Sequence, residues 1–357
     1  MNFKEHNKLE NYKVFFGNKQ FKLCLKHNPN SKKENEVKVF FDESWRKSNI
    51  QQIEATSLLL NKYIPIIFKE INKNLEFQEI SLKGNIKKLF LEKVNNQVKS
   101  QNIIKDFCNK FKERIKNQKE ALNEIGYRDI FNDKLKTAYR LVVGLGSGSF
   151  FETSLTLHHI FGIPYIPATA LKGVVRAVSF WEITKKQNVE DSISEFQKKL
   201  YDQDISNSDN EEIIVHKILF GSQNFKGLLL FLDAYPDVND LDIFELDVMT
   251  PHYQKYYTEN QTPGDWENPN PITFLTIKKG ISFQFNILLD KYRLQEIQKN
   301  RELYKDQLLN NKIQDIINKL LKNNYAELRE KVKNWIELAL KEFGVGAKTR
   351  LGYGIFE

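Results

Sequence analysis

The stretch that decides the fold is a glycine-rich segment directly behind a strongly amphipathic pattern. Its sequence is Gly344-Val345-Gly346-Ala347-Lys348-Thr349-Arg350-Leu351-Gly352-Tyr353-Gly354. Glycines at this density allow the backbone to adopt positive φ angles and to approach a partner closely. Backbone N–H groups flanked by Lys348 and Arg350 are suited to phosphate oxygens. The segment is therefore predicted to be a loop that binds a phosphate backbone.

Two other phosphate-binding motifs do not fit the glycines of this chain. A nucleoside-triphosphate loop needs a glycine directly before its lysine and a helix after it, but Ala347 precedes Lys348 and the following residues favour no helix. A dinucleotide fingerprint needs G-x-G-x-x-G, and the cluster that begins at Gly144 has Ser149 at the last glycine position. A nucleotide hydrolase is thus disfavoured. A flexible tail is the other alternative, and the strand-like residues 353–356 disfavour it because they would fix the far end of the loop.

The amphipathic pattern before the loop is the clearest helix in the chain. Its apolar residues recur at helical spacing, and they are Leu328, Val332, Trp335, Ile336, Ala339, Leu340 and Phe343. Gly344 is well placed as the C′ residue that ends this helix.

Residues 135–357 as a whole predict the order strand, helix, strand, strand, helix, strand. The first strand is expected over 136–143, and residues 272–278 and 281–289 are expected to form a hairpin around Lys279-Gly280. Residues 187–225 are interpreted as an insertion. The order is that of an α+β, ferredoxin-like (RRM-like) domain, although the standard RNP1 pattern of RNA-binding sheets is missing.

The first third of the chain, residues 1–134, is predicted to be a mostly helical accessory region, in which Tyr12–Phe16 and Val37–Phe41 are candidate short strands. Helical patterns are expected over residues 51–77 and 85–123, where apolar residues recur between lysines, glutamates and asparagines. The many lysines there are interpreted as a solvated helix face rather than as an RNA surface.

Composition narrows the class of protein. The chain has 357 residues, enough for one or two domains, and its net charge of +8 favours a polyanionic partner. Its abundance of Asn and Lys suggests a genomic bias that weakens this charge argument.

Cys24 and Cys108 are far apart in the sequence and fit a reducing cytoplasm. No signal peptide and no membrane span are expected, because no apolar run approaches ~18 residues.

Two further groups of residues admit two interpretations each. Thr169 is expected to cap a helix on which Lys172 and Arg176, four residues apart, share one face. These cations are either merely solvated or, with the N–H groups of the first turn, a site for a polyanion. His252 and Tyr253 precede further tyrosines, which suggests stacking on bases or riboses. Ordinary half-buried aromatic residues at a strand end are the alternative.

Four segments together resemble a known family. They are Arg140–Gly146, Gly162–Arg176, Asp247–Tyr253 and Gly344–Gly354. In these segments the chain resembles the RAMP proteins of type III CRISPR systems, and among them the family of the sixth subunit of the type III-B Cmr effector complex. The resemblance covers residues 135–357. One departure is Ala168-Thr169, where such proteins often carry Gly-Ser.

The resemblance implies a non-catalytic, RNA-binding structural subunit. It implies a position that caps a filament of RAMP subunits near the 3′ end of the guide RNA (crRNA), where the subunit supports target RNA recognition in antiviral defence. The implied partners are guide RNA, target RNA, other Cmr RAMP subunits and the small helical subunit of the complex, with no membrane and no cofactor. Residues and resemblance together predict these RNA contacts: Lys172, Arg176, His252, Tyr253, Gly344, Gly346, Lys348, Thr349, Arg350 and Gly352.

The competing function is a metal-independent RNA endonuclease, an activity found elsewhere among RAMP proteins. Such an enzyme needs a general acid or base, usually histidine, near the scissile phosphate. The candidates are His158, His159, His216 and His252. Because His158 and His159 are adjacent, a strand would point them to opposite faces. No cluster of metal-ligating residues is apparent in the sequence. We therefore expect no catalysis.

Overall fold

The computed structural model divides the chain into two compact units, which are described separately below. The first comprises Met1–Phe107, Gly144–Ile163 and Asp240–Thr276, and the second comprises Cys108–Val143, Pro164–Asn239 and Ile277–Glu357. The structure describes residues 12–16, 19–27, 37–41, 66–71, 74–77, 87–88, 91–92, 94–96, 103–147, 153–187, 193–201, 210–223, 225–237, 242–264, 266, 269–299 and 311–357. These units divide the chain differently from the predicted boundary between residues 134 and 135, which stays a prediction.

An antiparallel sheet lies at the centre of the second unit. Its middle strand is β11 (Ser282–Asp290), which pairs with β6 (Tyr127–Lys136) on one side and with β7 (Leu229–Phe231) and β8 (Tyr235–Pro236) on the other. On the outer side of β6, Phe356 forms an isolated bridge with Thr137. The mixed helix and strand content and the antiparallel sheets confirm the coarse α+β prediction.

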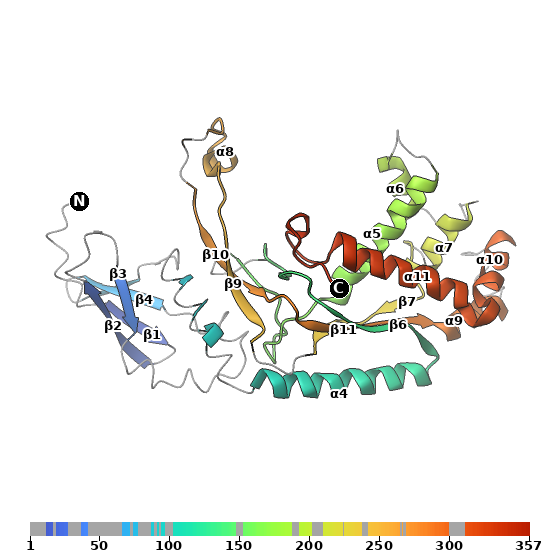
Figure 1. Ribbon diagram of the computed structural model, residues 1–357, viewed down its shortest axis with the longest axis horizontal. Helices are drawn as coiled ribbons and strands as arrows, with labels where there is room; N and C mark the ends of the chain where they lie inside the picture. Colours follow the sequence, from blue (N-terminus) through green and yellow to red (C-terminus); the bar gives the residue numbers. More distant parts are fainter. Residues whose placement is uncertain are drawn as a thin grey trace. The chain divides into compact units, whose positions relative to one another are not determined.

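Helices cover both faces of this sheet (Figure 1). On one face lie α5 (Ala168–Lys186) and α11 (Ala326–Leu338), and on the other face lies α4 (Ile103–Glu124). The remaining helices are α6 (Ile193–Tyr201), α7 (Glu211–Phe220), α9 (Lys291–Lys299) and α10 (Asn311–Leu321). Irregular helical turns flank α11: the 3-10 turn η5 (Lys322–Tyr325) precedes it and the π-helical turn η6 (Ala339–Phe343) follows it.

The hydrophobic core lies between the sheet and the helices α5, α7 and α11. Alternate residues of β11, Phe283, Phe285 and Ile287, point into it, as the period of two of a strand dictates. The predicted apolar face of α11 is confirmed up to Leu340, whereas Phe343 is 43% exposed. Burying this stripe stabilises the helix far more than its intrinsic propensity does.

The segment interpreted as an insertion contributes to the core. All residues of α7 from Ile213 to Phe220 are buried. Asn210 begins this helix by accepting hydrogen bonds from the amides of Glu212 and Ile213 at 2.9 and 3.2 Å, a capping role typical of asparagine. At least this part of residues 187–225 is therefore structural and not a surface addition.

The predicted hairpin around Lys279-Gly280 is wrong. Strands occur on both sides, but β10 (Ile272–Ile277) pairs with β9 (Phe244–Met249) while β11 pairs with β6 and β7. Buried Thr137 takes up the hydrogen bonds of the turn: its hydroxyl donates to the Lys278 carbonyl at 2.7 Å and accepts from the Ile281 amide at 3.0 Å. The contact spans more than a hundred residues of sequence, so local pattern did not predict it.

The first predicted strand is displaced. It was expected over residues 136–143, but β6 ends at Lys136. Beyond it, Leu141 makes only an isolated bridge with Ile277. The stretch after β6 therefore runs as irregular backbone, and this stretch supports the glycine-rich loop.

Strands, not the predicted helices, occupy part of the first third of the chain. In the first unit, a five-stranded antiparallel sheet has the order β3-β2-β1-β4-β5. Its strands are β1 (Tyr12–Phe16), β2 (Lys19–His27), β3 (Val37–Phe41), β4 (Ile66–Ile71) and β5 (Asn74–Phe77). The candidate short strands at Tyr12–Phe16 and Val37–Phe41 are confirmed as β1 and β3, whereas the prediction of a mostly helical region over 1–134 is wrong for β2, β4 and β5. It is right for α4, and part of the expected helix over 51–77 lies outside the described residues.

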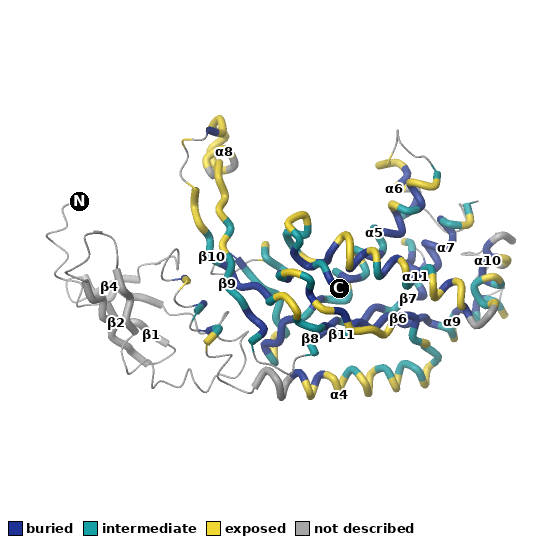
Figure 2. Tube along the Cα trace, in the orientation of Figure 1, coloured by how far each residue is buried: buried dark blue, intermediate teal, exposed yellow. Residues whose placement is uncertain are grey.

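The first unit also contains a long hairpin of β9 and β10 with the short helix α8 (Gln254–Glu259) between the strands (Figure 1). Much of the end of this hairpin around α8 is exposed (Figure 2). Among the described helices, none is both long and apolar enough to cross a lipid bilayer.

Candidate nucleic-acid interface

The glycine-rich loop begins where α11 widens into the π-helical turn η6. Gly344 ends the turn with φ +74°, and its amide donates to the Ala339 carbonyl at 2.8 Å. This confirms its predicted capping role. The wide turn leaves the Leu340 carbonyl to accept from the Phe356 amide at 2.9 Å. The two ends of the loop are therefore joined at the end of the helix.

Two loop glycines are required by close backbone contact. A Cβ on Gly346 would lie 2.4 Å from the Val142 carbonyl oxygen, and one on Gly354 would lie 2.0 Å from the Val345 carbonyl oxygen. Both residues also have positive φ, +102° and +68°, where side chains are disfavoured. The predicted positive-φ backbone is confirmed at these positions.

Hydrogen bonds fix the base of the loop against the irregular stretch that follows β6. The Ala347 amide donates to the Val142 carbonyl, and the Gly354 amide donates to the Arg140 carbonyl, each at 2.8 Å. Within the loop, the Val345 amide donates to the Gly354 carbonyl at 3.0 Å. The loop is thus held at both ends, as the sequence predicted.

The apex of the loop is the part that faces outward. Lys348 has φ +60° and precedes a short 3-10 turn, η7 (Thr349–Leu351). Arg350 and Leu351 are exposed, the latter by 67%, while Lys348 and Thr349 are half-buried. The apex therefore presents a cation from a backbone of fixed shape.

The expectation that the amides of this loop face a phosphate is wrong for most of them. Six donate within the protein, and they belong to Gly344, Val345, Ala347, Leu351, Gly352 and Gly354. An amide that already donates inside the protein is not available to a phosphate oxygen. The side chains at the apex, rather than these amides, are what the loop offers to an anion.

Lys172 and Arg176 share one face of α5, as predicted, but that face is half-buried. Burial, and after it the charge of Arg176, lowers the pKa of Lys172. The Arg176 guanidinium lies 3.9 Å from the centre of the Tyr201 ring in α6, and burial lowers its pKa too. Such a stacked guanidinium stabilises the contact between α5 and α6.

A carboxylate of the protein itself lies at the first turn of α5. The Asp233 carboxylate accepts a hydrogen bond from the Ala168 amide at 2.7 Å. The predicted cap by Thr169 is wrong, since this residue is exposed within the first turn and the helix has no side-chain cap of its own. A carboxylate at a helix N-terminus offsets the partial positive charge there, so the Ala168 amide is not available to a phosphate. The RNA contacts of Lys172 and Arg176 stay a prediction.

His252 and Tyr253 lie on the β9–β10 hairpin of the first unit, directly before α8. Both are exposed, and Tyr253 has the unusual backbone angle φ +26°. Their rings lie 6.2 Å apart at a tilt of 51°. They belong to a different compact unit from the glycine-rich loop, and their role in stacking stays a prediction.

Comparison with known proteins decides the family. The model of the RAMP superfamily matches residues 134–357. The chain belongs to the RAMP superfamily. The match starts within one residue of the resemblance inferred from the four sequence segments, and it includes the glycine-rich loop and α5.

Among curated RAMP relatives, the chain is 30% identical over 349 residues to the "CRISPR system Cmr subunit Cmr6" of Pyrococcus furiosus, covering 84% of this chain and 93% of the relative. It is also 30% identical over 243 residues to the Cmr6 of Saccharolobus solfataricus, covering 67% of this chain and 70% of the relative. The crystal structure of the Pyrococcus furiosus protein is 29% identical, with a TM-score of 0.37 and coverage of 65% of this chain and 98% of that chain.

A cryo-EM structure of the type III-B Cmr-beta complex bound to cognate target RNA contains a chain that is 20% identical, with a TM-score of 0.44. The match covers 70% of this chain and 64% of that chain.

His216 and the adjacent residues His158 and His159 lie in different surroundings. His216 is fully buried, its Nδ1 lies 2.9 Å from the Ser179 hydroxyl, and burial lowers its pKa to about 3. His158 and His159 stack on each other with ring centres 4.9 Å apart, so the expectation of opposite faces is wrong. Among the described residues, no three His, Cys, Asp or Glu side chains form a group that could hold a metal ion.

Sequence reasoning missed two residues that support the RAMP glycine-rich loop. Tyr139 packs edge-on against Tyr353, with ring centres 5.3 Å apart. Arg140 lies over the Tyr139 ring and donates to its hydroxyl at 2.6 Å. Arg140 belongs to a segment that carries the family resemblance, but no sequence motif indicated a role for its side chain. The irregular stretch that follows β6 thus adds a cation beside the base of the loop.

Proposed function

We propose that this chain is an RNA-binding structural subunit of a type III-B Cmr effector complex. In this proposal it caps a filament of RAMP subunits near the 3′ end of the guide RNA and supports target RNA recognition in antiviral defence in the cytoplasm. Two relatives named as Cmr6, each 30% identical, support the complex. The proposed partners are guide RNA, target RNA, other Cmr RAMP subunits and the small helical subunit.

The proposal includes a ferredoxin-like arrangement of the second unit, which its strand order supports. The antiparallel order is the Phe356 bridge, β6, β11 and β7. Helix α5 follows β6 in sequence, and α11 follows β11, with both helices on one face of the sheet (Figure 1). Two strand–helix–strand halves interleaved in this way are what the ferredoxin-like arrangement requires.

The observation that carries RNA binding is the apex of the glycine-rich loop. Lys348 and Arg350 extend from a short turn whose base is fixed by glycine contacts and backbone hydrogen bonds. Fixed cations contact phosphates without regard to base sequence, which suits a guide whose spacer varies. Helix α4 covers the sheet face that RRM-type proteins use for RNA (Figure 1). We therefore assign the backbone contact to the loop.

The proposal includes no bond-breaking by this subunit. A nuclease of the expected type would need a histidine beside the bound phosphate. His216 is fully buried, and burial lowers the pKa of its ring to about 3, so it is poorly suited to act as a general acid or base on a bound phosphate. These observations favour a structural role over the endonuclease alternative.

The test compares two double substitutions of equal charge. Lys348→Ala with Arg350→Ala should lower the slope of log affinity against log salt by about 1.4, because each lost contact to single-stranded RNA removes roughly 0.7. Lys185→Ala with Lys279→Ala, two exposed cations outside the loop, serves as the control and should leave the slope nearly unchanged. Fluorescence anisotropy with a labelled guide RNA measures both.

Equal slopes in the two double variants would place the phosphate contacts elsewhere. Cleavage of the guide RNA by purified protein is the second readout. Robust cleavage that disappears in His252→Ala would favour the endonuclease and reject the structural role.

A further inference from the structure

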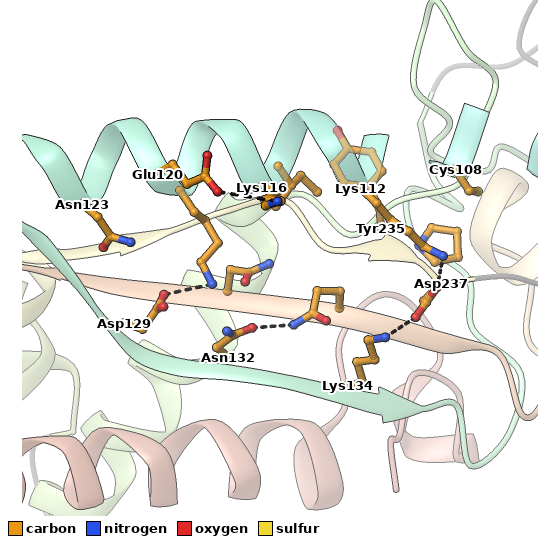
Figure 3. Close-up of a pocket in the computed structure, with 15 residues that line it drawn as sticks. Cys108, Lys112, Lys116, Glu120, Asn123, Asp129, Asn132, Lys134, Tyr235 and Asp237 are labelled. Atoms are coloured by element: carbon orange, nitrogen blue, oxygen red, sulfur yellow. Dashed lines mark hydrogen bonds and ion pairs between the residues drawn. The ribbon is translucent and has the colours of Figure 1, made fainter. Parts of the chain in front are cut away.

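A pocket of about 440 Å³ lies between α4 and the sheet face that the helix covers. Figure 3 shows its walls, which come from α4, β6 and β11 and from the segment around β8. The volume falls in the range of roughly 300–1,000 Å³ that small-molecule sites occupy. All its lining residues belong to the second unit.

The strand register explains why this pocket is polar. Along β11, Phe283, Phe285 and Ile287 point into the core, so Gln284 and Asn286 point to the opposite face, toward α4. On the neighbouring strand, Asn132 pairs directly opposite Asn286. The floor of the pocket is therefore a patch of amide side chains.

Charged side chains around the floor leave a small positive excess. The lining contains Lys112, Lys116, Lys119 and Lys134 against Glu120, Asp129 and Asp237, four cations to three carboxylates. Lys112 and Lys134 both pair with Asp237, and Lys119 pairs with Asp129 at 3.1 Å.

One lysine at this pocket is only loosely held. Lys116 lies 3.8 Å from Glu120 where α4 lines the pocket, and both side chains are largely exposed. At this separation a surface ion pair contributes little. Lys116 is the lysine that could most readily contact an incoming anion.

A buried donor on the floor has no partner. Asn286 is 1% exposed, and its Nδ2 group makes no hydrogen bond. The neighbouring Asn132 oxygen accepts instead from the side-chain amide of Gln284 at 2.8 Å. An unsatisfied buried donor is costly, so this group is suited to an acceptor that enters the pocket.

We propose that this pocket binds a nucleotide whose base carbonyl accepts a hydrogen bond from Asn286 and whose phosphate lies against Lys116. Amide side chains that bond the edge of a base are typical of RNA recognition. The choice of a nucleotide as ligand rests on the proposed RNA-binding function. The same chemistry could come from a free nucleotide or from the terminal nucleotide of an RNA strand.

The test measures binding of uridine 5′-monophosphate to the full chain by calorimetry. Asn286→Leu should weaken binding about tenfold, since a lost hydrogen bond of ~1.4 kcal/mol corresponds to that factor. Lys116→Gln should weaken binding several-fold and reduce its salt dependence. Lys110→Gln removes the same charge from an exposed position of α4 outside the lining and should match the unchanged protein.

Two controls keep the result interpretable. Asn286→Leu alters a buried position, so thermal unfolding must show that it folds, and Lys116→Gln tests the same pocket from an exposed position. Lys348→Ala with Arg350→Ala should retain mononucleotide binding. Loss of RNA binding in that loop variant with normal mononucleotide binding, or the reverse, separates the two proposals.

Photocrosslinking distinguishes the two sources of the nucleotide. Crosslinks from 4-thiouridine 5′-monophosphate should map to peptides of α4 or β11, and crosslinks to the same peptides from an RNA ending in 4-thiouridine would identify a strand terminus. If only the free nucleotide crosslinks there, the pocket takes a free nucleotide. Absence of binding, equal binding by both pocket variants and the unchanged protein, or equal competition by inorganic phosphate would overturn the proposal.

Discussion

Two regions of the second unit each carry a lysine and an arginine, and the surroundings of the two pairs differ. In the glycine-rich loop, Arg350 is exposed at an apex that backbone contacts hold in place. On α5, the guanidinium of Arg176 stacks on Tyr201, and the helix start is occupied by Asp233. Each region pairs a lysine with an arginine, two residues apart in the loop and four residues apart on α5. What differs is what packs around each cation, which decides whether a phosphate can reach it.

The largest expected effect breaks the loop at its base. Gly354→Ala should lower the free energy of unfolding by about 2–4 kcal/mol, because the new Cβ would lie 2.0 Å from the Val345 carbonyl oxygen at a positive φ. Urea unfolding followed by circular dichroism measures this change.

The matched control is a glycine on the other region. Gly173→Ala on α5 places a Cβ where no atom lies within 4 Å, and it should raise stability by about 0.5–1 kcal/mol because alanine favours a helix interior. If both substitutions had the same effect, close contact would not be what fixes the loop.

The second prediction concerns the pKa of His216, which reports how well water is excluded from the region near Arg176. Burial, with smaller effects from the charges of Arg176, Lys217 and Lys331, lowers the pKa of His216 to about 3 in the folded protein, against ~6.5 unfolded. Since only the unfolded chain takes up the proton between these values, this contribution is complete above pH ~6.5 and is lost as pH falls. The loss should be about 2 kcal/mol at pH 5.

The double variant His216→Phe with Ser179→Ala serves as the control, because it removes the titrating ring and its hydroxyl partner together. Its stability should fall less steeply than that of the unchanged protein between pH 6.5 and 5. Parallel curves would mean that water reaches His216 and that the region around α7 is more solvated than described.

The smallest expected effect concerns the stacked cation itself. Arg176→Ala should lower stability by about 1 kcal/mol through loss of the contact with Tyr201, with little change in the salt dependence of RNA binding. Arg350→Ala should do the opposite. A reduced salt slope in Arg176→Ala would show that this side chain contacts phosphate after all, as the sequence predicted.

Much of the fold followed from local pattern, and the failures have a common physical cause. The periodicity from Leu328 to Leu340 predicted α11 because one face of a helix is set by residues close in sequence. The partner of β11 was not predictable in this way, because Thr137, far away in sequence, separates β10 from β11. Short strands among lysines, such as β4, also lacked a distinctive pattern.

The candidate site shows the same difference between features set by local sequence and features set by distant residues. The positive φ of the loop glycines was predicted from composition and spacing alone. The burial of Arg176 was missed because Tyr201 lies in a segment that was interpreted as an insertion. Asp233, which satisfies the start of α5, is 65 residues away. Neighbours of this kind are set by tertiary packing, which local sequence does not encode.

The π-helical turn Ala339–Phe343 absorbs one residue more than an α-helical turn over nearly the same rotation. Deleting one residue within it would permit an ordinary turn and leave the direction of the following segment almost unchanged. Deleting one residue from α11 would instead swing that segment by roughly 100° about the helix axis. Arg350 would then point in another direction although every residue of the loop was intact. A length change inside a helix can therefore silence a surface that it never touches.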